Sequence, residues 1–414
     1  MASPNLLNIS NSPQKVQLVR IAHIYQKHPD LQKWEVFAKD FGFVEAARQG
    51  GKIYFRGYGK DPYCVVASAS ENGKKEFGGA AFIAKTEEDF EKAKKIPGAK
   101  LVDISSAPGG GKMVSIPTPT NNFIHVIWGQ VERDEPRSPP STIKVAYREL
   151  NTSLEKIRQG EFQRLKHGPA LIHKLGHFGY VTKKFDEDVQ FYTSNFNFVI
   201  SDLLSNPKNQ NEDVTCFLHL DHGEEYVDHH CLFFARAPGL FPETRLHHTS
   251  YEVDDFDTQL MGHEWLLKKS YKLVWGVGRH ILGSQIFDYW KDPSGFTIEH
   301  YADGDLVNQH HKITREPDGG GLSLAIWGPA FDQIRFSGLS RRDLLQIAIA
   351  TFKWPLISVI ILAGVALPSL TSARSLVYNL LHSRGSEMSQ YTPSTVAAAA
   401  ALDIIFSFFF FLGI

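Results

Sequence analysis

The most constraining feature of this sequence is an internal repeat in its second half. The segments LGHFGYVTKKFDED (175–188) and LHHTSYEVDDFDTQ (246–259) align without gaps and share Leu, His, Tyr, Phe and Asp at the same offsets. His177 therefore corresponds to His248. In each copy the pattern predicts a strand, a polar turn, a helix and then further strands, so each copy opens one structural module.

The first half repeats this plan more weakly. Short β-rich runs alternate there with two segments of helical period, at 30–43 and 87–96. The run VRIAHIYQ (19–26) resembles the opening strand of the later modules, and GGAAFIAK (78–85) resembles its partner. We therefore expect an α+β fold in which four βαβββ modules are paired into two domains.

A polar, proline-rich segment, ERDEPRSPPSTIK (132–144), separates the two halves and predicts a domain boundary. We expect an N-terminal module pair within 1–150 and a C-terminal module pair within 165–310. A hydrophobic extension at 337–414 follows.

One acidic residue lies in an apolar setting. Glu299 follows Phe296, Thr297 and Ile298, where an unpaired buried carboxylate would cost several kcal/mol or take up a proton. A bound divalent cation would supply the compensating charge. Module pairing would bring this carboxylate to the two repeat-related histidines, and two imidazoles with one carboxylate suit Fe(II) and oxygen chemistry.

Each of these three residues also has an ordinary interpretation. His177 alone could be a hydrogen-bonded strand histidine, His248 a member of an exposed pair, and Glu299 an outward residue on an edge strand. Their repeat-related places favour the metal site over these interpretations.

A longer motif surrounds the acidic residue. It comprises His280, seven residues, Asp288, Tyr289, two residues, Asp292, Pro293, one residue, Gly295, three residues and Glu299. This resembles the signature of the type I extradiol ring-cleaving dioxygenases of the vicinal oxygen chelate superfamily, such as the catechol 2,3-dioxygenases and 2,3-dihydroxybiphenyl 1,2-dioxygenases. The resemblance covers the plan of residues 15–310, with the motifs confined to 175–301. Asp288 departs from the signature, which has an apolar residue there, and this makes the local strand packing an open question.

The resemblance implies a metal site and a reaction. His177, His248 and Glu299 look like the ligands of Fe(II), although Mn(II) also accepts such a set. A catechol and dioxygen are the implied substrates, and cleavage next to the diol is the implied reaction. The resemblance also implies a homo-oligomer.

Three further residues look catalytic by the same likeness. His230, rather than His229, matches a histidine that stabilises the reacting oxygen or exchanges protons with it. His280 and Tyr289 are expected to line the substrate side, where they can transfer a proton or donate a hydrogen bond. His247 is expected to be a bystander, because adjacent strand residues point to opposite faces.

The N-terminal half is expected to lack the metal. His23 matches His177, but the places of the other two ligands fall near Ala81 or Phe82 and at Val126, which cannot bind a metal.

Two other functions remain open at this point. A metal-dependent isomerase of the glyoxalase type would keep the fold but would normally use a fourth protein ligand. A non-catalytic small-molecule binding protein could be built from the same modules.

Charge and cysteine content indicate the setting. Lys plus Arg (44) balances Asp plus Glu (45) without a basic stripe, which argues against a nucleic-acid partner. Three cysteines, Cys64, Cys216 and Cys231, lack C-x-x-C spacing and suit a reducing compartment. The first residues lack the basic and then apolar pattern of a secretory signal. We expect the main body to be cytoplasmic.

The extension leaves its own alternatives open. Residues 344–370 and 396–414 carry one charge each, and the first run is long enough to span a bilayer. Arg341 and Arg342 before it would favour a cytoplasmic start. The extension either attaches the protein to a membrane, packs on the protein, forms an oligomer contact or reflects an imperfect gene model.

Overall fold

The computed structural model describes residues 6–134, 144–146, 150–162, 164–237, 243–319 and 324–330. The chain divides into two compact units, Met1–Phe331 and Asp332–Ile414. The second unit lies outside the described residues, and so does the predicted extension at 337–414. No helix in the described ranges is both long enough and apolar enough to cross a membrane.

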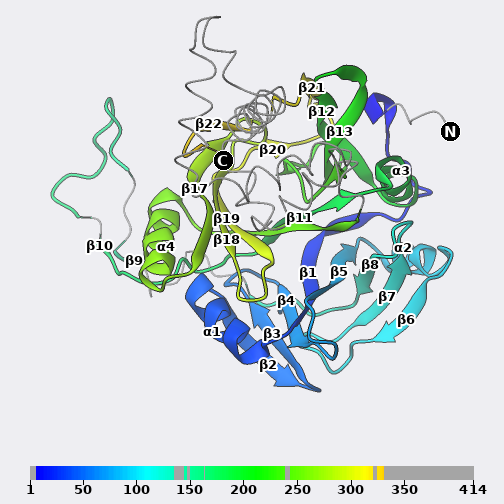
Figure 1. The fold of residues 1–414 in the computed structure, drawn as a ribbon, viewed down its shortest axis with the longest axis horizontal. Helices are drawn as coiled ribbons and strands as arrows, with labels where there is room; N and C mark the ends of the chain where they lie inside the picture. Colours follow the sequence, from blue (N-terminus) through cyan, green and yellow to red (C-terminus); the bar gives the residue numbers. More distant parts are fainter. Residues whose placement is uncertain are drawn as a thin grey trace, which may run out of the picture. The chain divides into compact units, whose positions relative to one another are not determined.

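The first two modules form an eight-stranded sheet (Figure 1). A short 3-10 helix, η1 (Leu6–Asn8), precedes it. Module one comprises β1 (Leu18–His28), α1 (Leu31–Phe41), β2 (Val44–Gln49), β3 (Lys52–Arg56) and β4 (Val65–Ala69). Module two comprises β5 (Glu76–Ala84), α2 (Glu87–Ala93), β6 (Lys100–Asp103), β7 (Lys112–Pro117) and β8 (Phe123–Trp128). The strand order is β2-β3-β4-β1-β5-β8-β7-β6, so the opening strands of the two modules pair at the centre.

The other two modules form a ten-stranded sheet on the same plan. Module three comprises β11 (Leu175–Thr182), α3 (Phe185–Asn195), β12 (Phe198–Asn206), β13 (Asn209–Leu220), β14 (Val227–Asp228) and β15 (Leu232–Arg236). Module four comprises β16 (Arg245–Glu252), α4 (Phe256–Lys268), β17 (Lys272–His280), β18 (Ile286–Lys291) and β19 (Thr297–Ala302). The order β21-β12-β13-β15-β11-β16-β19-β18-β17-β22 adds the short edge strands β21 (Thr314–Pro317) and β22 (Ala325–Trp327). The predicted α+β fold of four paired βαβββ modules is confirmed, whereas the predicted boundaries at 150 and 165 stay predictions.

Two short ribbons complete the described strands. One pairs β9 (Lys144–Ala146) with β10 (Arg164–Leu165), and the other pairs β14 with β20 (Leu306–Val307).

The helices begin and end where local chemistry dictates. The side chain of Asp30 caps α1 by accepting a hydrogen bond from the backbone N–H of Lys33, and Asp255 caps α4 in the same way. Gly42 ends α1 in the left-handed region with φ 108°, and a Cβ there would meet the backbone oxygen of Ala170. Helix α1 buries one face, formed by Trp34, Phe37, Ala38 and Phe41.

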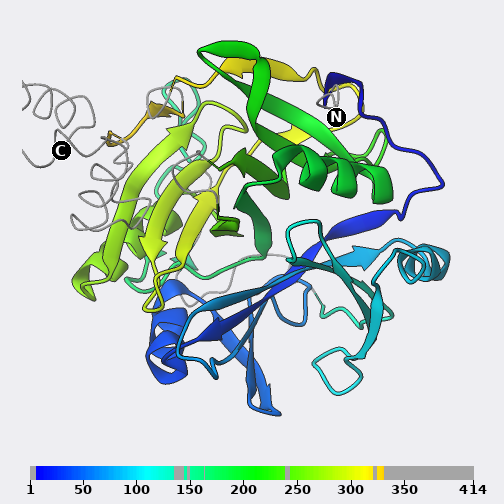
Figure 2. The ribbon, with the colours of Figure 1, turned by 45° about the vertical axis from the view of Figure 1, so that its right-hand side comes forward.

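The two sheets share one hydrophobic core. Rings from both halves pack against each other, for example Phe82 on Phe198 with centroids 5.4 Å apart and Phe43 on Tyr251 at 4.8 Å. Helices α1 and α4 also lie side by side (Figure 2). There, Trp265 on α4 donates a hydrogen bond to Asp40 on α1 (3.0 Å). The N-terminal sheet therefore supports the strands of the C-terminal one directly.

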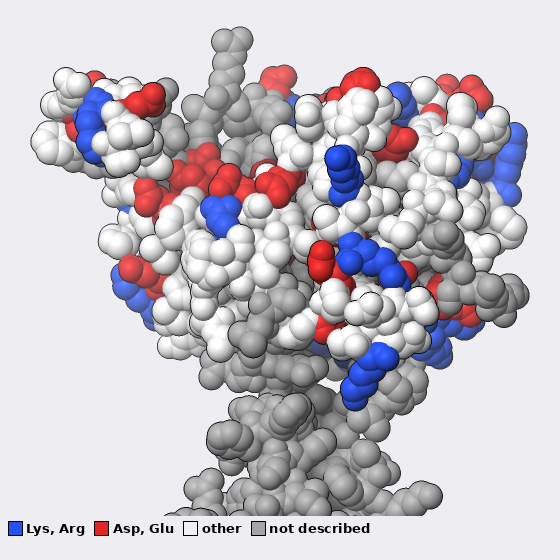
Figure 3. Space-filling model, turned by 90° about the horizontal axis from the view of Figure 1, so that it is seen from above, with Lys and Arg blue, Asp and Glu red and all other residues white. Residues whose placement is uncertain are grey.

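On the face shown in Figure 3, acidic and basic side chains are intermingled.

Strand pairing corrects the predicted places of the missing ligands in the N-terminal half. His23 pairs with Ala81 as His177 pairs with Ser250, so Gly79, two residues earlier, takes the place of His248. His125 pairs with Ala81 as Glu299 pairs with Ser250. The prediction of Ala81 or Phe82 and Val126 was therefore wrong by one to three residues.

The corrected positions still do not form a metal site. Gly79 has no side chain to bind a metal. A Cβ there would lie only 2.9 Å from Nε2 of His125, so His125 fills the space where a side chain at position 79 would lie. That nitrogen is hydrogen-bonded to the backbone oxygen of Gly78 (2.8 Å), and the ring of His23 packs on Tyr63 (4.4 Å). No group of metal-binding side chains is found here among the described residues.

Candidate metal centre

Three neighbouring strands at the centre of the ten-stranded sheet position the predicted ligands. His177 lies on β11, His248 on β16 and Glu299 on β19. Ser250 on β16 pairs with His177 on one side and with Glu299 on the other. Because side chains alternate along a strand, His248, two residues from Ser250, lies on the same face of the sheet.

A β-bulge immediately before His177 helps to aim this side chain. Leu175 pairs with Tyr251 and His177 with Ser250, so Gly176 is the extra residue. A Cβ at Gly176 would lie 2.3 Å from the ring of Tyr301, so a larger residue would displace that ring. The glycine therefore allows both the bulge and the aromatic contact beside His177, where the ring centroids lie 5.7 Å apart.

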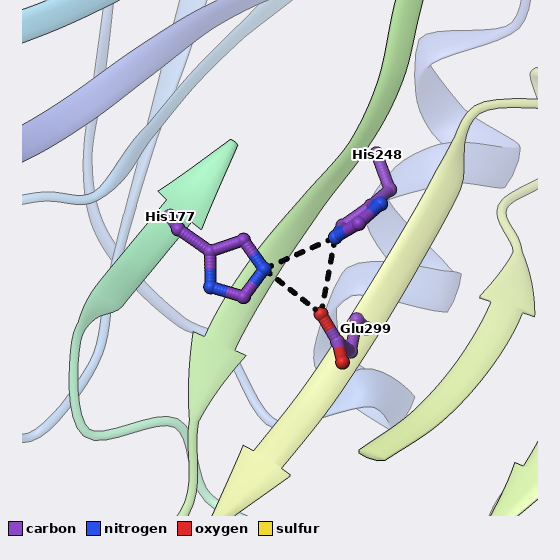
Figure 4. A group of neighbouring side chains, drawn as sticks. All are labelled: His177, His248 and Glu299. Carbon is purple, nitrogen blue, oxygen red and sulfur yellow. Dashed lines mark hydrogen bonds and ion pairs between the residues drawn. The ribbon is translucent and has the colours of Figure 1, made fainter. Parts of the chain in front are cut away.

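The three ligand atoms form a nearly equilateral triangle. Nε2 of His177 and Nε2 of His248 lie 3.1 Å apart, and each lies 3.2 Å from Oε2 of Glu299 (Figure 4). Atoms bonded to one ion at about 2.1 Å lie about 3.0 Å apart at right angles and about 3.4 Å apart in a tetrahedron. The observed separations lie between these two values, so they fit three ligands of an octahedral or a tetrahedral divalent ion, and either geometry leaves another position open.

The electrostatics of the triangle also suit a cation. Glu299 is fully buried. Burial alone would raise the pKa of its carboxyl, but the neighbouring imidazoles of His177, His248 and His280 hold that pKa well below its usual range, and neither carboxylate oxygen has a hydrogen-bond partner among the described residues. Burial lowers the pKa of His248 to about 4, which keeps a lone pair on this imidazole. An ionised carboxylate and neutral imidazole are the forms that bind metals.

His247 is not the bystander that strand alternation predicts. Gly179 pairs with His248 and Tyr180 with Leu246, so His247 is the extra residue of a β-bulge. Its Nδ1 lies 2.7 Å from Nδ1 of His248. Such a contact fixes the ring orientation of a metal-binding histidine and directs its other nitrogen toward the metal.

The other three predicted residues lie beside the triangle. The ring of His230 lies 4.2 Å from the ring of His177, between centroids. Tyr289 Oη is hydrogen-bonded to Nε2 of His280 (3.0 Å), whose Nδ1 donates to the backbone oxygen of Leu324 (2.8 Å). The ring of Tyr289 also meets His248 edge-on at 5.1 Å. All six residues selected from the sequence are thus brought together.

Asp288, the departure from the signature, lies on the other face of β18 with its own partners. Its Oδ1 lies 3.0 Å from Nδ1 of His263 on α4, and its Oδ2 accepts a hydrogen bond from Nε1 of Trp290 (2.7 Å). These contacts satisfy a carboxylate that has no exposed surface. The strand packing is therefore intact, and the substitution leaves the metal-facing side unchanged.

The turn of the signature contacts the N-terminal half rather than the metal centre. Asp292 Oδ2 accepts a hydrogen bond from Nε1 of Trp34 on α1 (2.9 Å), and Ser294 Oγ lies 2.9 Å from Nδ1 of His28 on β1. This contact fixes the β18–β19 hairpin that carries Glu299. Sequence reasoning missed it because the partners are about 260 residues apart.

The fold and the site define a class of protein. Residues 174–300 match the sequence family described as the Glyoxalase/Bleomycin resistance protein/Dioxygenase superfamily, which places this segment among the vicinal oxygen chelate domains. The match covers the three predicted ligands, the neighbouring His230 and the whole signature.

Individual proteins show the same likeness. Metapyrocatechase 2 of Cupriavidus necator is 29% identical over 159 residues, which are 38% of this chain and 45% of the relative. The match thus spans less than half the length of that relative. The resemblance to extradiol dioxygenases that the motifs indicated is confirmed.

Solved structures share the fold at lower identity. The Mn(II)-bound glyoxalase of Novosphingobium aromaticivorans has a TM-score of 0.59 at 19% identity, covering 76% of this chain and 92% of that chain. A substrate complex of homoprotocatechuate 2,3-dioxygenase from Brevibacterium fuscum has a TM-score of 0.61 at 15% identity, covering 80% and 95%. A glyoxalase and a dioxygenase thus share this fold, so the fold alone does not distinguish between these two activities.

Proposed function

We propose that the protein is a non-haem iron(II) extradiol dioxygenase that cleaves the ring of a catechol with dioxygen. The observation that carries this proposal is the convergence of His177 Nε2, His248 Nε2 and Glu299 Oε2 at mutual distances of 3.1–3.2 Å. The 29% identity to a metapyrocatechase over 159 residues supports it. Fe(II) is the proposed ion, and Mn(II) fits the same ligands.

The metal would act as a Lewis acid on the two catechol oxygens and would bring dioxygen beside them. The protein supplies the rest. Burial raises the pKa of the Tyr289 hydroxyl well above the usual range and keeps it protonated. In the structure this hydroxyl donates to the bare Nε2 of His280, and it would turn from that nitrogen to donate to a developing oxyanion. His280 orients that hydroxyl. His230, whose ring packs against the ring of His177, is placed to exchange a proton with the substrate or the reacting oxygen.

Two observations favour this function over its alternatives. Within the described residues, the group of metal-binding side chains at this place has three members, whereas a glyoxalase-type isomerase is expected to use a fourth. A non-catalytic binding protein would not need His230, His280 and Tyr289 gathered beside the triangle. Dioxygen and a catechol are therefore the proposed partners, in a homo-oligomer.

A ring-cleavage assay tests the proposal. Protein loaded with Fe(II) without oxygen is mixed with a panel that includes catechol, 4-methylcatechol and 2,3-dihydroxybiphenyl, and oxygen is then admitted. We expect a yellow semialdehyde or muconate-type product, with one dioxygen consumed for each ring cleaved. Failure to take up oxygen with every member of the panel would contradict the proposal. Tightly held zinc, together with isomerase activity on a glutathione hemithioacetal, would favour the alternative enzyme.

A further inference from the structure

Two buried hydrogen bonds connect Asp202, through His229, with His230 beside the candidate metal centre. Oδ2 of Asp202 lies 2.7 Å from Nε2 of His229, and Nδ1 of His229 lies 3.1 Å from Nδ1 of His230. All three side chains are buried. The last of them packs against His177, so this chain of contacts ends at the triangle of ligands.

The contacts around Asp202 fix the direction of the first hydrogen bond. Its Oδ1 accepts hydrogen bonds from Thr314, from the backbone N–H (2.9 Å) and from the hydroxyl (2.6 Å). Although burial alone would raise it, the contacts with His229 and Thr314 hold the pKa of the Asp202 carboxyl below its usual range, so the group is ionised and can only accept. Nε2 of His229 therefore carries the hydrogen and donates it to Asp202.

The second hydrogen bond follows from the first. His229 is buried beside three further histidines, with His230 and His311 at 5.3 and 5.9 Å between ring centroids and His219 bound to the same serine hydroxyl that contacts the His229 carbonyl. A neutral His229 that donates from Nε2 has a bare Nδ1, which accepts the hydrogen on Nδ1 of His230. The tautomers are assigned from this network.

We propose that Asp202 and His229 are positioning residues that hold His230 in the tautomer with a bare Nε2 beside the metal centre. This rests on the proposed function for its chemical meaning, because a bare Nε2 is the form that accepts a hydroxyl proton from a catechol. The proton moves from the catechol oxygen to Nε2, and the resulting imidazolium keeps its Nδ1 hydrogen bond to His229. The ionised Asp202 stabilises that positive charge through His229.

Asp202, His229 and His311 could instead be taken for a second metal site, since their ligand atoms lie within 4.8 Å of one another. Their contacts favour hydrogen bonding. Nε2 of His311 is 3.9 Å from Oδ1 of Asp202 and 3.1 Å from the backbone oxygen of Ser201, and Thr314 already donates twice to Oδ1. An ion would have to displace these donors.

The tautomer can be measured directly. Nitrogen-15 NMR of histidine-labelled, metal-free protein distinguishes protonated from bare ring nitrogens, and the His230 signals are assigned by their loss in H230Q. We expect wild-type His230 to carry its hydrogen on Nδ1. In D202N, the amide oxygen would accept from Thr314 and the amide N–H would face His229, which reverses both rings and moves the hydrogen of His230 to Nε2. The control H263Q breaks another His–Asp contact, with Asp288, and is expected to leave His230 unchanged.

Kinetics provide the second readout. In the Fe(II)-loaded enzyme, D202N is expected to lower kcat by on the order of 10²-fold with KM and metal content nearly unchanged, while H263Q keeps the wild-type kcat. A hydrogen on Nε2 of wild-type His230 would overturn the proposal even if D202N fails to fold. A His230 that still carries its hydrogen on Nδ1 in D202N would also overturn the proposal. So would a second metal ion that wild-type protein binds and D202N does not. If wild-type protein cleaves no catechol, the proposed function fails while the tautomer measurement still decides the positioning role.

Discussion

Replacing Glu299 with glutamine, E299Q, is expected to weaken binding of Mn(II) or Fe(II) by more than about 100-fold and to abolish ring cleavage. Glutamine keeps the shape of the side chain but removes the negative charge that, in the part of the chain that the structure describes, meets His177 and His248. Loss of an outer partner of a metal ligand typically costs about 10- to 100-fold in affinity, and loss of a charged ligand costs more. Metal titration of the apoprotein without oxygen measures the affinity.

The control for E299Q is D288N on the same hairpin. Asp288 is equally buried but contacts His263 and Trp290 on the other face of the sheet, so D288N is expected to bind the ion as wild type does. Added Mn(II) should raise the unfolding temperature of wild type and of D288N, because it binds only the folded state, and should leave that of E299Q unchanged. Wild-type affinity in E299Q would show that the ion binds elsewhere.

Replacing His230 with glutamine, H230Q, is expected to lower kcat on the order of 10²- to 10⁴-fold without loss of metal. His230 packs against His177 but contributes no atom to the triangle of ligands, so its removal takes away a proton-exchanging group and leaves the ion in place. Steady-state kinetics with 4-methylcatechol, together with metal analysis of the same sample, separate the two effects.

The matched control for H230Q is H310Q, since His310 lies on the surface with its imidazole paired to Glu224. H310Q is expected to keep the wild-type kcat. A kcat for H230Q within about three-fold of wild type would remove His230 from the chemistry. Loss of the ion from H230Q would instead make it part of the metal site.

The arrangement of modules and the ligand triangle could be predicted because both follow from local patterns. The repeat fixes one histidine in each of two modules, and pairing of the opening strands brings His177 and His248 together. Glu299 could be found because a carboxylate in an apolar strand needs a compensating charge. None of these steps needed to know how the two halves of the chain contact each other.

What the sequence could not supply depends on strand irregularities and on distant contacts. A β-bulge carries one extra residue without a sequence mark, so the alternation rule failed at His247. Asp202 could not be linked to His229 because they are 27 residues apart on a strand and a loop whose approach is set by the sheet. Sequence also gave no reason to connect Asp292 with Trp34.

Anomalous X-ray scattering at the iron edge, from crystals loaded with Fe(II) without oxygen, tests the central claim most directly. We expect one strong peak per chain, about 2.1 Å from Nε2 of His177, Nε2 of His248 and Oε2 of Glu299. The absence of an iron peak at these three atoms, or an iron peak only between Asp202, His229 and His311, would contradict the proposed metal centre.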